Sequence, residues 1–191
     1  RLHEGMSADR VAKHAFELGA DTAALTHGHP TGQVAAGYVA ALVGLLALGR
    51  PLAESLDRAS AILVRKPGHT ETMAAVEHAR KLAAAGAPNA EYLARLGEGW
   101  TAEEAVAIAV YAALAAPDFD TGVRLAVNHD GDSDSTGAIA GNLLGTLHGI
   151  ESIPTRFTTG LELVEAIAQV ADDLATFPTW PIGQFEPSSE A

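Results

Sequence analysis

The sequence contains no cysteine, which excludes disulfides, cysteine-ligated zinc sites and cysteine nucleophiles. This absence is typical of a reducing compartment, and we expect a cytoplasmic location. Basic residues are also scarce: 12 lysines and arginines stand against 24 aspartates and glutamates, a formal net charge of −12. Because binding to phosphates through bulk charge requires cations, we expect neither nucleic acid nor a membrane surface as a partner. A phosphorylated ligand would have to bind through a metal ion, backbone N–H groups or a helix N-terminus.

Long hydrophobic runs and strand patterns are absent too. The longest apolar stretch, residues 34–48, is shorter than the roughly 20 residues that cross a bilayer. No segment alternates apolar and polar residues as a half-buried strand does; apolar residues recur instead at helical spacing. The sequence therefore predicts an all-α, compact multi-helix domain over residues 1–176, followed by an irregular tail over residues 177–191.

Capping residues, prolines and glycines divide the chain into successive helices. Ser7 would cap the first, and Pro30 suits the first turn of the second. Thr101 and Glu104 form a capping-box pattern at the start of a later helix. The inner face of the first helix is predicted to comprise Val11, Ala15, Phe16 and Leu18. The other helices are expected over residues 31–48, 52–64, 71–85, 102–116, 135–149 and 161–175, with a short helix from Asp120 or Thr121 to about residue 128.

The segment VNHDGDSDSTGAIAGNLLG joins alternating aspartates to a helix rich in glycine. Residues two apart point the same way in an extended loop, so the carboxylates of Asp132 and Asp134 share one side. Together with the Ser135 hydroxyl they suit a hard divalent cation with oxygen ligands. From the residues alone an alternative stays open, in which Asp134 or Ser135 caps the following helix and the other acids favour its positive end.

Glycines recur at every fourth position of this helix, at residues 137, 141, 145 and 149. Each costs about 1 kcal/mol relative to alanine in a helix interior. We expect this loss to be offset by the close approach of another backbone or of a ligand along the glycine stripe, in a helix central to the core.

The order GDSDSTGAIAGNLLG resembles the C-terminal signature of the ADP-ribosylglycohydrolase family, which includes the dinitrogenase reductase-activating glycohydrolases. ALTHGHPTG resembles the Thr-His segment of that family, and GWTAEEAVAIAVYAAL resembles the segment that leads to its acidic loop. The resemblance runs from residue 24 to about residue 174. It implies an all-α protein that hydrolyses the bond between ADP-ribose and a protein side chain or another acceptor.

The resemblance also implies two magnesium ions in a cleft. Asp132 and Asp134 would be catalytic metal ligands, with Ser135 as a further ligand, while Asp130 would lie behind them or face solvent. Glycosidic cleavage at the ribose passes through an oxocarbenium-like state, and metal ions can orient the ribose hydroxyls, activate water and offset phosphate charge. The residues expected to bind the substrate are His27, His29, Asn128, Gly131 and Ser133.

Two groups of residues keep alternative interpretations. His27 and His29 could instead form part of a zinc site or be structural histidines at a helix start. Three aromatic side chains could stack on adenine or, more commonly, pack in the core: Tyr92, Trp100 and Trp180.

The sequence departs from the family in its first half. Members carry a glycine-rich opening and a Thr/Ser-Asp-Asp triplet that supplies the other metal ligands, and neither is found here. The one Asp-Asp pair, Asp172-Asp173, is expected on a solvated helix face. We therefore expect a fragment, one subunit of a split hydrolase, or a non-catalytic module that binds ADP-ribose or a protein. The expected partners are an ADP-ribosylated protein or an ADP-ribose-like small molecule, and a separate N-terminal segment or subunit.

Overall fold

The computed structural model describes residues 6–176, among which no strand occurs, so the all-α prediction is confirmed. Residues 2–153 form one compact unit and residues 154–191 belong to a second, a division that the sequence did not indicate. The predicted tail, residues 177–191, lies outside the described residues. The helices of the first unit are α1 (Ala8–Ala24), α2 (Pro30–Ala47), α3 (Leu52–Leu63), α4 (Thr70–Ala83), η1 (Ala90–Arg95), α5 (Ala102–Ala115), α6 (Phe119–Val127), α7 (Ser133–His148) and η2 (Ile150–Ser152).

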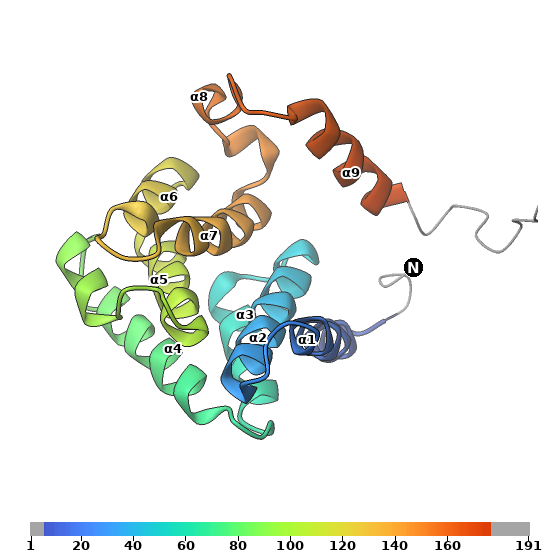
Figure 1. The fold of residues 1–191 in the computed structure, drawn as a ribbon, viewed down its shortest axis with the longest axis vertical. Helices are drawn as coiled ribbons and strands as arrows, with labels where there is room; N and C mark the ends of the chain where they lie inside the picture. Colours follow the sequence, from blue (N-terminus) through green and yellow to red (C-terminus); the bar gives the residue numbers. More distant parts are fainter. Residues whose placement is uncertain (1–5, 177–191) are drawn as a thin grey trace, which may run out of the picture. The chain divides into compact units, whose positions relative to one another are not determined.

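Helices α2 and α5 form the centre of the first unit (Figure 1). Helix α1 packs along α2, α4 packs along α5, and α7 contacts α2, α5 and α6. Every residue from 105 to 113 is buried, as is typical of a helix that is apolar on all sides. Among the described helices only α2 is long and apolar enough, by length and composition, to cross a membrane; half of it is buried inside the unit, so its place in the core accounts for its hydropathy.

Small residues allow α1 and α2 to approach closely. A Cβ atom at Gly37 would lie 2.7 Å from the carbonyl oxygen of Phe16, and one at Gly19 would lie 2.7 Å from the Cβ of Ala40. This packing fixes the loop between the two helices, which carries His27. The predicted inner face of α1 is wrong at Leu18, whose side chain is 57% exposed, because the buried face centres on Val11, Ala12 and Phe16.

The start of α5 differs from the predicted capping box. Thr101 occupies the N-cap position but makes no side-chain cap hydrogen bond. The Glu104 carboxylate instead accepts hydrogen bonds from the backbone N–H groups of Glu98 (3.2 Å) and Gly99 (3.1 Å). Glu104 therefore ties the preceding loop to α5, while the first turn of α5 keeps uncapped N–H groups.

Other helix boundaries also differ from the predictions. Helix α6 begins at Phe119 because Asp118 is its N-cap and accepts a hydrogen bond from the Thr121 N–H (2.8 Å). In the second unit a short helix α8 (Thr155–Thr158) precedes α9 (Val164–Thr176), which begins later than expected. No residue of α9 is buried, and Asp172 is exposed as expected.

The glycines of α7 do not share one role. A Cβ at Gly137 would lie 2.5 Å from the Val127 side chain, whereas one at Gly141 would meet no atom within 4 Å. Gly149 has a φ of +80° and ends the helix. The expectation that another backbone of this chain approaches the stripe is therefore wrong. The helix is buried through a different set of residues: Thr136, Ala140, Leu143 and Leu144.

Burial raises the pKa of Tyr38 to about 12, and its hydroxyl lies 3.4 Å from the Ser60 hydroxyl. Because the folded-state pKa lies above the unfolded value, the contribution to stability is complete below about pH 10 and is lost as the pH rises toward 12. We expect this loss to reach roughly 3 kcal/mol. Urea unfolding from pH 9 to 12 should show that loss for the native chain and a much smaller one for Tyr38→Phe, with Tyr92→Phe as control. Parallel curves for all three proteins would contradict the prediction.

Candidate functional site

The acidic loop leads directly into α7. Because α7 begins at Ser133, Asp132 occupies its N-cap position, with φ −76° and ψ 71°, yet makes no side-chain cap hydrogen bond. Asp134 lies in the first turn, where its carboxylate accepts a hydrogen bond from the Ser135 N–H (2.9 Å). The N-cap residue is therefore Asp132 and not Asp134 or Ser135, and the Asp132 carboxylate makes no cap hydrogen bond. The other part of that alternative agrees with the structure, since the Asp134 carboxylate lies at the positive end of the helix and accepts a hydrogen bond from a first-turn N–H.

The side chains of Asp132 and Asp134 lie within hydrogen-bonding reach of one another. A hydrogen bond between the side chains of Asp134 and Asp132 holds the pKa of Asp134 below its ordinary value, and the backbone N–H of Ser135 adds to the effect. Two carboxyl groups this close repel when both are ionised. A cation bound between the two carboxylates would remove that repulsion.

A second loop, residues 97–99, lies just before α5 in the sequence and contacts the acidic loop. The Glu98 carbonyl accepts a hydrogen bond from the Asp132 N–H (2.7 Å). A Cβ atom at Gly131 would lie 1.8 Å from the same Glu98 oxygen, so no larger residue fits there. Gly99 has a φ of +78°, and a Cβ there would lie 2.7 Å from the Thr136 methyl group. Contact with the Glu98 carbonyl therefore requires glycine at position 131, independently of the predicted approach to a ligand.

The remaining residues of the acidic loop differ in what their side chains do. Ser133 is half-buried, and its hydroxyl lies 3.2 Å from the His129 carbonyl oxygen and 3.4 Å from that of Gly131. Asn128, the C-cap residue of α6, is exposed, as is Asp130. Asn128 is thus open to solvent, whereas the Ser133 hydroxyl is engaged within the loop.

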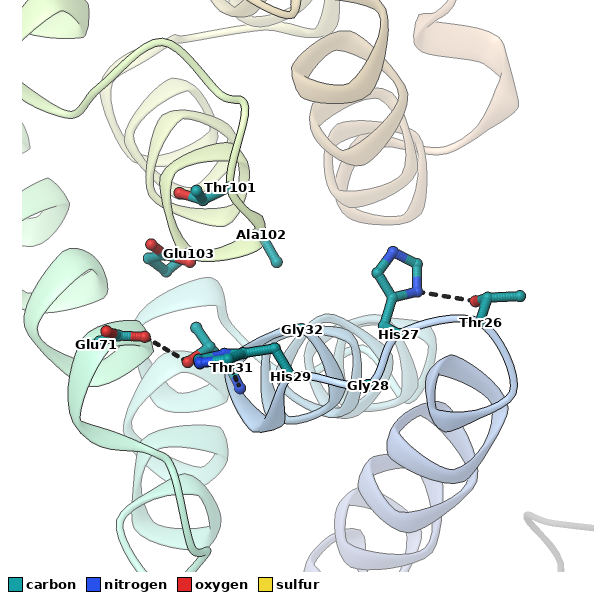
Figure 2. A pocket seen from close by; sticks show the side chains of 10 residues that line it. All are labelled: Thr26, His27, Gly28, His29, Thr31, Gly32, Glu71, Thr101, Ala102 and Glu103. Atoms are coloured by element: carbon teal, nitrogen blue, oxygen red, sulfur yellow. Dashed lines mark hydrogen bonds between the residues drawn. The ribbon is translucent and has the colours of Figure 1, made fainter.

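A pocket of about 570 Å³ lies at the starts of α2, α4 and α5 (Figure 2). The hydroxyl of Thr31, a buried residue, donates a hydrogen bond to the Glu71 carboxylate on one side of the pocket. Glu103 from the first turn of α5 lies on that same side, whereas the His27 ring stands on the other. The pocket is lined by Thr26, His27, Gly28, His29, Thr31, Gly32, Glu71, Thr101, Ala102 and Glu103.

The two pocket histidines are turned apart. His27 Nδ1 lies 2.8 Å from the Thr26 hydroxyl, whereas His29 is the N-cap of α2 and its Nδ1 accepts a hydrogen bond from the Thr31 N–H (3.4 Å). Within residues 6–176, no three His, Asp or Glu side chains gather as metal ligands. The zinc interpretation therefore gains no support, and His29 has the structural role that was left open.

The N-terminus of α5 connects the pocket to the acidic loop. Thr101 and Ala102 line the pocket, and two residues before Thr101 the Gly99 backbone packs against the acidic loop. A second, mainly apolar pocket of about 370 Å³ is lined by both His27 and Ile139 of α7. The two segments that carry the resemblance, about 100 residues apart in the sequence, thus border adjoining pockets.

The comparison with protein families bears on this arrangement. Residues 4–181 match the model of the family described as ADP-ribosylglycohydrolase, which covers nearly the whole chain. The chain belongs to the ADP-ribosylglycohydrolase family. Membership supports a glycohydrolase-type activity on ADP-ribosyl linkages. No curated protein gave a significant match.

The oxygen donors of the acidic loop in this family member are of the kind that would hold one side of a magnesium ion. Two carboxylates and a hydroxyl, from Asp132, Asp134 and Ser135, follow one another at the start of α7. Magnesium prefers six oxygen ligands in octahedral array and commonly keeps several waters. Three further oxygens would therefore come from water, from a substrate or from another segment of protein.

Several site residues of this family member were not predicted from its sequence. Glu71 meets Thr31 across 40 residues of sequence, and nothing in the local pattern marks it. The pair of glycines around Glu98 was a usable signal, because two glycines so close indicate an unusual loop backbone. Trp100 is 71% exposed, so the core interpretation is wrong for this side chain.

Of the other two aromatics, the structure describes only Tyr92. Tyr92 is half-buried and makes an edge contact with Tyr111, with ring centroids 6.2 Å apart, which is a packing role. Trp180 lies outside the described residues.

Proposed function

We propose that this chain takes part in magnesium-dependent hydrolysis of the glycosidic bond between ADP-ribose and a protein side chain or another acceptor. The observation that carries the proposal is the pair of neighbouring carboxylates at the start of α7, Asp132 and Asp134, of which Asp132 makes no cap hydrogen bond. In a member of the ADP-ribosylglycohydrolase family, a pair of this kind is best explained as metal ligands. Two ions are expected in the complete site, with this chain supplying part of the ligands.

The residues of the chain would bind and orient the substrate. The pocket of about 570 Å³ has the size of a small-molecule site. The first turn of α5 has no side-chain cap, so its N–H groups are available to phosphate oxygens. His27, on the side of the pocket opposite Glu71 and Glu103, is the donor best placed for a ribose or phosphate group. These contacts would allow a chain of net charge −12 to hold a pyrophosphate.

The acidic loop would act at the reacting bond. Magnesium, when bound, would offset phosphate charge and polarise a ribose hydroxyl or a water molecule. The negative charges of Asp132 and Asp134 would favour the positive charge that develops on the ribose in an oxocarbenium-like state. Asn128, exposed beside the loop, would contact the sugar or the acceptor.

Two other functions remain as alternatives. The exposed Trp100, next to the pocket and the acidic loop, favours a module that binds ADP-ribose by stacking without cleaving it. The incomplete ligand set favours one subunit of a split hydrolase, in which a partner contributes the remaining oxygens. The two alternatives differ in whether a second polypeptide restores turnover.

The test measures ADP-ribose release from an ADP-ribosylated protein, with magnesium and with a chelator in its place. We expect release that requires magnesium, in the full polypeptide or after addition of the segment that completes the site. Calorimetry with ADP-ribose is run in parallel. Binding without release would support the non-catalytic module, and neither binding nor release under any of these conditions would contradict the proposal.

A further inference from the structure

The side chain of His129 links the acidic loop to its two neighbouring helices. The Gly131 N–H points to His129 Nδ1 at 3.1 Å, so Nδ1 is a hydrogen-bond acceptor and carries no proton. The ring proton of a neutral imidazole is then on Nε2, which lies 2.9 Å from the Thr136 hydroxyl oxygen and donates to it. The Thr136 hydroxyl in turn donates to the carbonyl oxygen of Ala126 at 2.8 Å.

Each end of this hydrogen-bond relay is fixed. Thr136 and Ala126 are fully buried, and they belong to the first turns of α7 and the last turn of α6. The Ser133 hydroxyl lies 3.2 Å from the backbone carbonyl oxygen of His129, which closes the loop on itself. A single half-buried imidazole thus joins α6, the acidic loop and α7.

We propose that His129, in its Nε2-protonated form, is a positioning residue that holds the acidic loop on α7 and thereby fixes the spacing of the Asp132 and Asp134 carboxylates. What those carboxylates bind rests on the proposed function. His129 is not a ligand itself, because both of its ring nitrogens are engaged within the protein.

The relay joins the loop to α6 and α7, whereas a separate contact joins it to the segment before α5. The Glu98 carbonyl holds the loop through the Asp132 N–H, on the side of α5. Without the imidazole this contact would remain, but the Gly131 N–H and the Thr136 hydroxyl would each lose a partner. The loop would stay attached and lose its fixed orientation. Residues that orient metal ligands in this way typically contribute about 10–100-fold in metal affinity.

Three substitutions separate the two halves of the relay. His129→Asn keeps an acceptor for the N–H two residues later, as asparagine does in turns, but does not reach Thr136. His129→Gln keeps a donor long enough for Thr136 and leaves the Gly131 N–H without an acceptor. His129→Phe keeps a ring and loses both contacts. His148→Phe, at the exposed far end of α7, is the matched control.

The first measurement needs no metal. In the native protein, ¹⁵N spectra should show a pyridine-like Nδ1 and a pyrrole-like Nε2 for His129, and the Gly131 amide should be protected from hydrogen exchange. Protection of that amide should persist in His129→Asn and be lost in His129→Gln and His129→Phe. The opposite tautomer, or unchanged protection in His129→Phe, would overturn the inference.

The second measurement is the affinity for Mn²⁺, used as a spectroscopically visible substitute for Mg²⁺. We expect a loss of about 10–100-fold in His129→Phe, smaller losses in the asparagine and glutamine variants, and no change in His148→Phe. Equal affinity of His129→Phe and the native protein would overturn the positioning role. If the native protein binds no Mn²⁺ even after addition of the segment that completes the site, the proposed function fails, and the tautomer and exchange results still decide the role of His129. Circular dichroism of each variant confirms that it is folded.

Discussion

Asp132→Asn is expected to reduce magnesium-dependent release of ADP-ribose by on the order of 100- to 1,000-fold. The substitution keeps the shape of the side chain but removes the charge of one of the two carboxylates at the start of α7. Because the Asp132 side chain makes no cap hydrogen bond, the fold should not depend on it. The melting temperature should therefore change little while activity is lost.

Asp130→Asn is the matched control, since Asp130 is an exposed aspartate of the same loop. Both variants remove one negative charge, so a general electrostatic effect would appear in both. Release and Mn²⁺ affinity are measured for the two variants and the native protein. Equal activity of Asp132→Asn and Asp130→Asn would show that the acidic loop acts only through its charge or not at all, and would remove the basis of the metal site.

Gly131→Ala is expected to have the largest effect on the structure of the site. The added Cβ would lie 1.8 Å from the Glu98 carbonyl oxygen, a backbone atom that cannot move aside alone. The two loops must separate, which breaks the hydrogen bond between the Asp132 N–H and that carbonyl. Forced displacement of this kind typically costs about 1–3 kcal/mol or more. Urea unfolding should show this loss, together with weaker Mn²⁺ binding.

Gly141→Ala provides the comparison within the neighbouring helix. No atom lies within 4 Å of the position of its Cβ, so alanine should stabilise α7 by up to about 1 kcal/mol. Equal stabilities for Gly131→Ala and Gly141→Ala would contradict the close approach of the two loops. Loss of ADP-ribose release in a stabilised Gly141→Ala protein would instead show that a substrate or partner contacts this glycine.

The helices were predictable because their signals are local. Apolar residues at helical spacing, Ser7 as an N-cap and Pro30 in a first turn all act within a few residues, and the structure has helices at these positions. The acidic loop was predictable for the same reason, since its aspartates and the following helix form one continuous segment. Helix starts were less accurate where several neighbouring residues could begin a helix: α6 was predicted to start at Asp120 or Thr121 and starts at Phe119, after Asp118.

The supports of the site were not predictable, because they come from residues far apart in the sequence. The carbonyl of Glu98 faces Gly131, and the carboxylate of Glu71 faces Thr31. Such contacts depend on how whole helices pack, and a single sequence has no pattern that pairs them. Leu18 was wrongly predicted to be buried for the same reason. Helical spacing shows which residues share a face, but the packing of other helices decides which face is covered.

The sequence by itself determined the all-α class, the order of the helices and the proximity of Asp132 and Asp134 at the start of α7. It did so because helix periodicity and the spacing of two aspartates are properties of neighbouring residues, although α7 begins at Ser133, before the predicted residue 135, so that Asp134 lies in the helix and not in an extended loop. The tertiary structure alone decided that Asp132 is free of capping, that Glu98 and His129 hold the loop, and that His27 borders the same pockets as α5 and α7. These features follow from the packing of separate helices, in which each contact is fixed by the shapes of both partners.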